Sequence, residues 1–140
     1  MILDLTAMQK AVKYLENGLG NACDSGFMSR LTESQKQLII AGVIQNFEFT
    51  YERSWKFIKR WLSENIGNTH VDGVTRRELF RLATQSRLID DVDKWMFYHA
   101  ARNQASHIYD EDIAQEVFEA AKEFVYTEKE LLAQLEARND

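Results

Sequence analysis

The sequence contains no proline and a single cysteine, Cys23, in 140 residues. Proline breaks the interior of a helix, so its absence is compatible with long uninterrupted helices. One cysteine cannot form an intrachain disulfide or a zinc site built from several cysteines, and this usage is typical of proteins from a reducing compartment. We therefore expect Cys23 to be an ordinary loop or core residue.

Long apolar runs are also missing. No segment approaches the roughly 18 consecutive apolar residues that span a bilayer, and residues 1–10 lack the basic start and apolar run of a signal peptide. These absences predict a cytoplasmic protein without membrane contact. The formal net charge of −5 argues against a general polyanion binder, since non-specific affinity for nucleic acids comes mainly from Lys and Arg.

Positive charge is nevertheless concentrated locally. It gathers in residues 53–60 and in Arg76, Arg77, Arg81 and Arg87, whereas acidic residues gather in the C-terminal third. Solvated helix surface is the simpler interpretation, and a functional basic face is the other. The aromatic residues of the segment 47–61 have two interpretations as well: a core or interface, or a surface on which bases stack.

Hydrophobic periodicity is helical almost throughout, and nothing in the pattern indicates a sheet. Apolar residues recur at steps of three and four in 5–22, 32–66, 91–109 and 110–135, with a shorter helix in 75–88 and a loop in 21–30. With 45% hydrophobic residues, the chain has enough apolar surface for one core. The predicted fold is all-α, an antiparallel up-and-down four-helix bundle with one additional short helix, forming one domain over residues 1–140.

Helix starts and stops have clear signals. Thr32 followed by Gln35, and Thr75 followed by Glu78, match the capping-box pattern, and Gly67 is a predicted C-terminal stop. The acidic run at 90–93 stands at the head of a helix, where carboxylates cap the chain and complement its dipole. We therefore do not interpret that run as a magnesium site.

The segment HAARNQASHIYDED, residues 99–112, is rich in polar and titratable side chains. In a continuous helix, His99, Asn103 and His107 share one face, while Arg102, Ser106 and Tyr109 line the adjacent face. An Arg suited to phosphate oxygens and a His that exchanges protons near neutral pH favour phosphoryl transfer without a metal. The alternative is a polar network that holds two helices in register.

A metal site is not expected. His70, His99 and His107 are scattered, and the last two are too far apart along a helix to share one ion without another element. We therefore predict no metal and no cofactor.

Two segments resemble a known family. ARNQASHIYDED, residues 101–112, resembles the signature R-N-x-x-x-H followed by x-Y of HEPN-domain proteins, with Arg102, Asn103, His107 and Tyr109 at the matching positions. FEFTYERSWKFIKRWL, residues 47–62, resembles the branch of nucleotidyltransferase substrate-binding proteins, which are encoded beside a minimal nucleotidyltransferase. The resemblance extends over nearly the whole chain.

This resemblance implies a helical bundle that forms a homodimer and associates with the small nucleotidyltransferase, as in toxin–antitoxin modules. In HEPN ribonucleases the motif Arg and His of both subunits cleave RNA without a metal. Here Arg102 and His107 would be catalytic, Asn103 would orient the phosphate or the His, and Ser106 and His99 would be accessory. Adenylylation of Tyr109 by the partner would block the site.

The resemblance also leaves a second function open, because such a protein can be a non-catalytic subunit that presents a substrate or nucleotide to the nucleotidyltransferase. The chain itself has no Gly-Ser loop followed by the closely spaced Asp pair of that enzyme. We therefore do not expect it to be a nucleotidyltransferase.

Overall fold

The computed structural model describes residues 2–139, which contain helices and no strand. The helices are α1 (Thr6–Ala22), α2 (Ser25–Met28), α3 (Glu33–Ile66), α4 (Asn68–Val71), α5 (Arg76–Gln85), α6 (Val92–Gln104), the 3₁₀-helix η1 (Ala105–His107) and α7 (Glu111–Ala137). The all-α prediction is confirmed. No helix in this part of the chain combines the length and the apolar character needed to cross a membrane.

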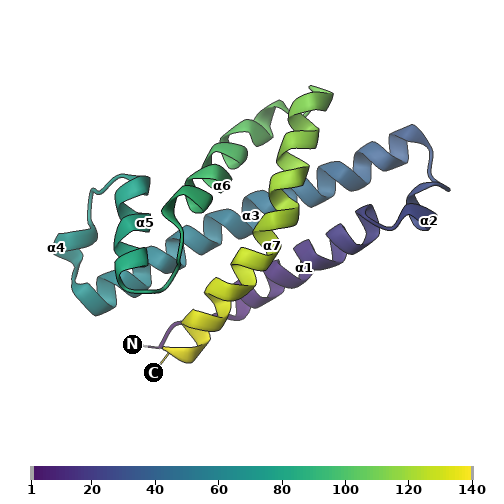
Figure 1. Ribbon diagram of the computed structural model, residues 1–140. Coiled ribbons are helices and arrows are strands. Elements are labelled where there is room, and N and C mark those ends of the chain that lie inside the picture. The colour runs from purple at the N-terminus through teal and green to yellow at the C-terminus, as the bar shows by residue number, and fades with distance from the viewer. Residues whose placement is uncertain (1, 140) are drawn as a thin grey trace.

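The long helices pack as antiparallel neighbours along the chain. Figure 1 shows α1 and the 34-residue α3 running in opposite directions, with α6 and α7 forming a second antiparallel pair against α3. The short helices α4 and α5 lie at the C-terminal end of α3, where α5 packs against both α3 and α6. The two chain ends lie together because the Asn139 amide side chain bonds both backbone groups of Leu3.

Local sequence signals determine where α3 and α5 begin. The Thr32 hydroxyl accepts from Gln35 N at 3.2 Å, and the Gln35 side chain accepts from Thr32 N at 2.9 Å, so the predicted capping box is present. Thr75 accepts from Glu78 N in the same way, but the Glu78 carboxylate pairs with Arg81 and does not complete the second box.

Helix stops follow the same logic. Gly67 ends α3 with φ of 97°, a conformation that strongly favours glycine. Asp91 caps α6 by accepting from Lys94 N at 3.1 Å, as the position of the acidic run predicts.

Three predicted boundaries are wrong. The loop at 21–30 contains α2, and α4 was not predicted. The helix predicted over 91–109 ends at Gln104 and continues as a single 3₁₀ turn. The physical reason is that Asp110 caps α7 by accepting from the backbone nitrogens of Asp112 and Ile113, so the chain must change direction within a few residues.

Large aromatic side chains fill the core between α3, α6 and α7. Phe47, Tyr51, Trp95, Tyr98 and Phe124 are fully buried, and Phe124 meets the other four rings at steep angles. Such edge-to-face packing adds about 0.5–1.5 kcal/mol per pair beyond area burial. In the aromatic segment of α3, the core interpretation therefore describes Phe47, Tyr51 and Phe57, whereas Phe49 is 58% exposed.

Candidate functional site

Arg102 lies in the last turn of α6 and faces two carboxylates of α3. Its Nε donates to Glu52 Oε1 at 2.9 Å, and its Nη1 lies 3.9 Å from Glu48 Oε2. Glu48 and Glu52 are four residues apart and therefore share one face of α3. Only Nε of the guanidinium makes a short bond. Glu48 and Glu52 therefore orient the Arg102 side chain while its other N–H groups remain available as donors.

The rest of the motif lies at the end of α6 and beyond it: Asn103 is in its last turn, and Ser106, His107 and Tyr109 follow it. Asn103, Ser106 and His107 are exposed, and their side chains make no hydrogen bond within residues 2–139. Tyr109 is 84% exposed, and its ring centroid lies 6.2 Å from that of His107. The predicted arrangement on two helical faces is therefore wrong for Ser106, His107 and Tyr109, since the helix ends before them.

His99 lies one turn before Arg102 and contacts a different neighbour. Its Nδ1 lies 2.8 Å from the hydroxyl of buried Tyr51. Burial, followed by the positive charge of Arg76, lowers the pKa of His99, and burial raises the pKa of Tyr51. Both groups are therefore neutral near pH 7, and His99 is held by the core while His107 is free.

On the far side of His99, Arg76 of α5 stacks on Trp55 of α3. The guanidinium carbon lies 3.4 Å from the centroid of the indole ring, a close cation–π contact. The indole Nε1 of Trp55 donates to Glu52 Oε2 at 3.0 Å. Glu52 therefore accepts from Arg102 through one carboxylate oxygen and from Trp55 through the other.

A cavity of about 680 Å³ adjoins the motif turn. It lies between the first half of α3 and the start of α7, and Tyr109 borders it together with Ile40, Ile44 and Ile108. The exposed Tyr109 side chain therefore lies beside an open hollow.

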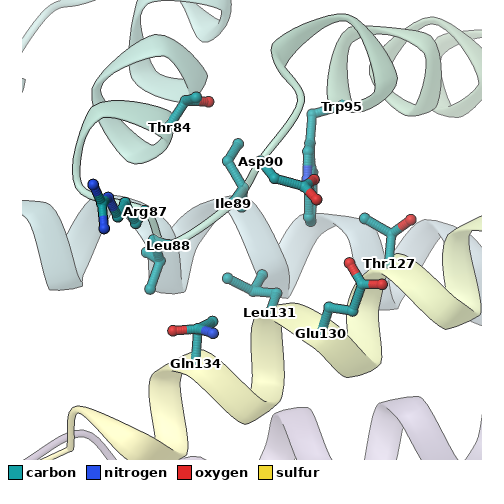
Figure 2. A pocket seen from close by; sticks show the side chains of 10 residues that line it. All are labelled: Thr84, Arg87, Leu88, Ile89, Asp90, Trp95, Thr127, Glu130, Leu131 and Gln134. Atoms are coloured by element: carbon teal, nitrogen blue, oxygen red, sulfur yellow. The ribbon is translucent and has the colours of Figure 1, made fainter.

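A separate cavity of about 520 Å³ contains none of the motif residues. Figure 2 shows the carboxylates of Asp90 and Glu130 facing the space between the α5–α6 connection and α7. The floor is apolar, with Leu88, Leu131 and Trp95 buried. Its charged lining residues are Asp90, Glu130 and Arg87, and the two carboxylates oppose the binding of a phosphate.

Sequence reasoning missed Glu48, Glu52 and the link from Tyr51 to His99. The spacing of two glutamates at i and i+4 in an otherwise apolar stretch of α3 was the available signal. Within residues 2–139, no three His, Cys, Asp or Glu side chains are close enough to hold one metal ion.

Comparison with known proteins identifies one family and a relative that matches nearly the whole chain. The family described as nucleotidyltransferase substrate binding protein like matches residues 3–137. A Haemophilus influenzae protein named probable ribonuclease HepT is 34% identical over 138 residues, which cover 98% of this chain and 94% of that protein.

Two solved structures share the fold. The structure of a Haemophilus influenzae protein, reported to reveal the fold of a substrate binding domain of a nucleotidyltransferase, aligns with a TM-score of 0.92 and 31% identity, covering 95% of this chain and 99% of that one. A Thermus thermophilus protein aligns with a TM-score of 0.72 and 22% identity over 91% of this chain and 98% of its own, which shows the fold alone.

Proposed function

Because the chain belongs to the nucleotidyltransferase substrate binding protein like family, we propose that it is the helical partner of a small nucleotidyltransferase and, when free of that partner, a metal-independent endoribonuclease. The observation that carries this proposal is an Arg102 guanidinium oriented by Glu52, followed at the adjoining turn by an exposed His107. The likeness to a probable ribonuclease over 98% of the chain supports it. In this proposal residues 1–140 act as one helical domain in the cytoplasm.

Arg102 binds the scissile phosphate. Glu52 occupies its Nε, so the terminal nitrogens remain for the phosphate oxygens. Negative charge grows on these oxygens as the reaction proceeds, and donors that are already oriented stabilise it without further rearrangement. Asn103, next to Arg102 and exposed, orients the phosphate or His107.

The nucleophile belongs to the RNA. The ribose 2′-oxygen attacks the adjacent phosphorus, the bond to the 5′-oxygen breaks, and the products are a 2′,3′-cyclic phosphate and a 5′-hydroxyl. His107 takes the 2′-hydroxyl proton, and the same histidine of a second copy gives a proton to the 5′-oxygen. His99 and Ser106 are accessory to this reaction.

A homodimer brings the two histidines to one cleft. The elements that carry the site expose aromatic side chains: Phe49 on α3, Phe97 on α6 and Tyr109 in the turn. If these residues lie on one face of the dimer, they form an apolar patch that a second copy covers.

Tyr109 is the proposed point of control. Its exposed hydroxyl is accessible to an enzyme, and its ring lies beside His107. Transfer of an adenylyl group by the nucleotidyltransferase adds a negative charge and bulk at this turn. Phosphate binding is then opposed by charge repulsion and by lack of space.

A non-catalytic subunit is the second candidate function. The specific observation that favours it is that Glu48 and Glu52 already oppose the charge of Arg102, which weakens any phosphate contact. The likeness to the substrate binding domain of a nucleotidyltransferase favours it too. In this case the chain presents a substrate and changes the activity of the partner enzyme.

An RNA cleavage assay with excess chelator separates the two functions. The native chain, Arg102→Ala and His107→Ala are compared without partner protein, with exposed Gln104→Ala as the matched control from the same turn. We expect each motif variant to lose at least about 100-fold in rate, because a preorganised donor or a proton-transfer group contributes that much. Absence of cleavage by the native chain would favour the substrate-binding subunit.

A further inference from the structure

Arg76 is a half-buried cation without a counter-ion. Its Nη1 is out of contact with solvent and has no hydrogen-bond partner. The ion pairs within residues 2–139 include Arg77, Arg81 and Arg102 but not Arg76. A guanidinium stays charged at any ordinary pH, so it cannot relieve this situation by losing a proton.

A pocket of about 320 Å³ surrounds this group. Trp55 and Lys59 of α3, the turn before α5, and His99 of α6 line it together with Arg76. Lys59 also forms no ion pair within the described part of the chain. The helices α3, α5 and α6 thus bring two unpaired positive charges to one small hollow.

The third polar group in the pocket is neutral. Tyr51 holds Nδ1 of His99, so Nε2 is the ring nitrogen left for a ligand. Arg76 and His99 line the same pocket, and the positive charge of Arg76 adds to burial in lowering the pKa of His99. Glu52, which lies one helical turn before Trp55, is already bonded by Arg102 and Trp55.

We propose that this pocket binds a terminal phosphate group, that is, a phosphomonoester carried by a nucleotide. Two cations match the charge of about −1.5 to −2 of a monoester better than the single charge of a phosphodiester inside a strand. The guanidinium offers a planar set of donors and the ammonium a point charge, the two ways in which proteins hold phosphate. A volume near the lower end of small-molecule pockets fits one phosphate group with part of its nucleoside.

This pocket goes beyond the proposed ribonuclease, because binding here requires neither Arg102 nor His107. The phosphate has two sources with the same chemistry: a free mononucleotide, or the phosphorylated 5′ end of an RNA strand. The binding experiment includes both.

Calorimetric titration of the full chain with AMP, and with adenosine as the probe that lacks phosphate, tests the pocket. Native protein, Arg76→Gln and Lys59→Gln are compared with Arg77→Gln, which removes the same charge from the neighbouring position outside the pocket. We expect AMP to bind, adenosine to fail, and Arg76→Gln to weaken AMP by about 10- to 100-fold, the usual value of a hydrogen bond to a charged group. Lys59→Gln weakens it less, and Arg77→Gln leaves it unchanged.

A short oligoribonucleotide with and without a 5′-phosphate, titrated in parallel, identifies the source. Preference for the phosphorylated strand with weak binding of AMP assigns the pocket to RNA ends. The proposal is overturned if neither AMP nor the phosphorylated strand binds, or if binding is the same in Arg76→Gln. Because Lys59→Gln leaves the stack on Trp55 in place, it tests the pocket even if Arg76→Gln unfolds. A chain that binds AMP and cleaves no RNA would retain this pocket while losing the proposed function.

Discussion

The two arginines on either side of His99 differ in one respect. Arg102 bonds Glu52 and lies near Glu48, whereas Arg76 lies on the ring of Trp55 and has no carboxylate partner. Both lower the pKa of His99. The comparison shows that the fold pairs the first cation with its own acids and leaves the second without a carboxylate among the described residues, as the proposed phosphate pocket requires.

A buried carboxyl group makes the contrast sharper. Glu128 of α7 is fully buried and has no cation beside it, and burial raises its pKa to about 8. The Ser54 hydroxyl lies 2.5 Å from Glu128 Oε2 and 2.6 Å from the carbonyl oxygen of Thr50. Since that hydroxyl has one proton, a protonated Glu128 that donates to Ser54, with Ser54 donating to Thr50, satisfies both contacts.

The largest expected effect is on the pH dependence of stability, because a buried carboxyl group can become neutral by taking up a proton whereas an arginine stays charged. Between a pKa of 4.5 in the unfolded chain and about 8 in the folded one, the unfolded state releases the Glu128 proton first. Stability therefore falls as pH rises through this window, by up to about 1.4 kcal/mol per pH unit from this group. Glu128→Gln keeps a donor for Ser54 and loses this dependence, which urea unfolding at pH 5, 6, 7 and 8 measures.

Exposed Glu130→Gln on the same helix is the matched control. If the native chain and Glu128→Gln lose stability in parallel with pH, Glu128 is ionised in the folded state. The proposal that Glu128 is protonated in the folded chain is then wrong.

Much of the fold followed from the sequence because helices carry local signals. The capping box at Thr32, the stop at Gly67 and the apolar periodicity of α3 each depend on neighbouring residues. The end of α6 did not follow, because the chain turns there through the cap that Asp110 gives to the next helix. A helix end that depends on the capping of the next helix cannot be predicted from the hydrophobic periodicity of either helix alone.

The second prediction concerns a variant in which Arg76, like Arg102, has a carboxylate beside it. Lys59→Glu removes one cation and places a carboxylate beside Arg76, so we expect AMP affinity to fall by about 100-fold or more, because two charged contacts are changed. Lys56→Glu makes the same change of charge on the neighbouring exposed face of α3, where Lys56 lies 5.7 Å from the Trp55 ring centroid. Equal losses in the two variants would indicate a general effect of net charge and not a specific pocket.

The site was predictable only in part. Arg102, Asn103, His107 and Tyr109 lie close together in sequence, so the motif makes them candidates without any knowledge of the fold. Tyr51 and Glu52 of α3 bond His99 and Arg102 from about fifty residues away along the chain. Arg76 was visible only as one of several basic residues, and its lack of a partner is a property of the folded chain.

The smallest expected effect concerns the carboxylate that orients Arg102. Glu52→Gln keeps an acceptor for Trp55 and removes the charge, so we expect RNA cleavage to slow by about tenfold through a less well-held guanidinium. Glu48→Gln, whose carboxylate lies 3.9 Å from Nη1, serves as the control and changes cleavage less. Hydrogen exchange at Arg102 Nε, measured by NMR, gives a readout that does not depend on activity, because the bond to Glu52 protects this proton in the native chain. Faster cleavage in Glu52→Gln would mean that Glu52 competes with phosphate for Arg102 and does not orient the guanidinium for catalysis.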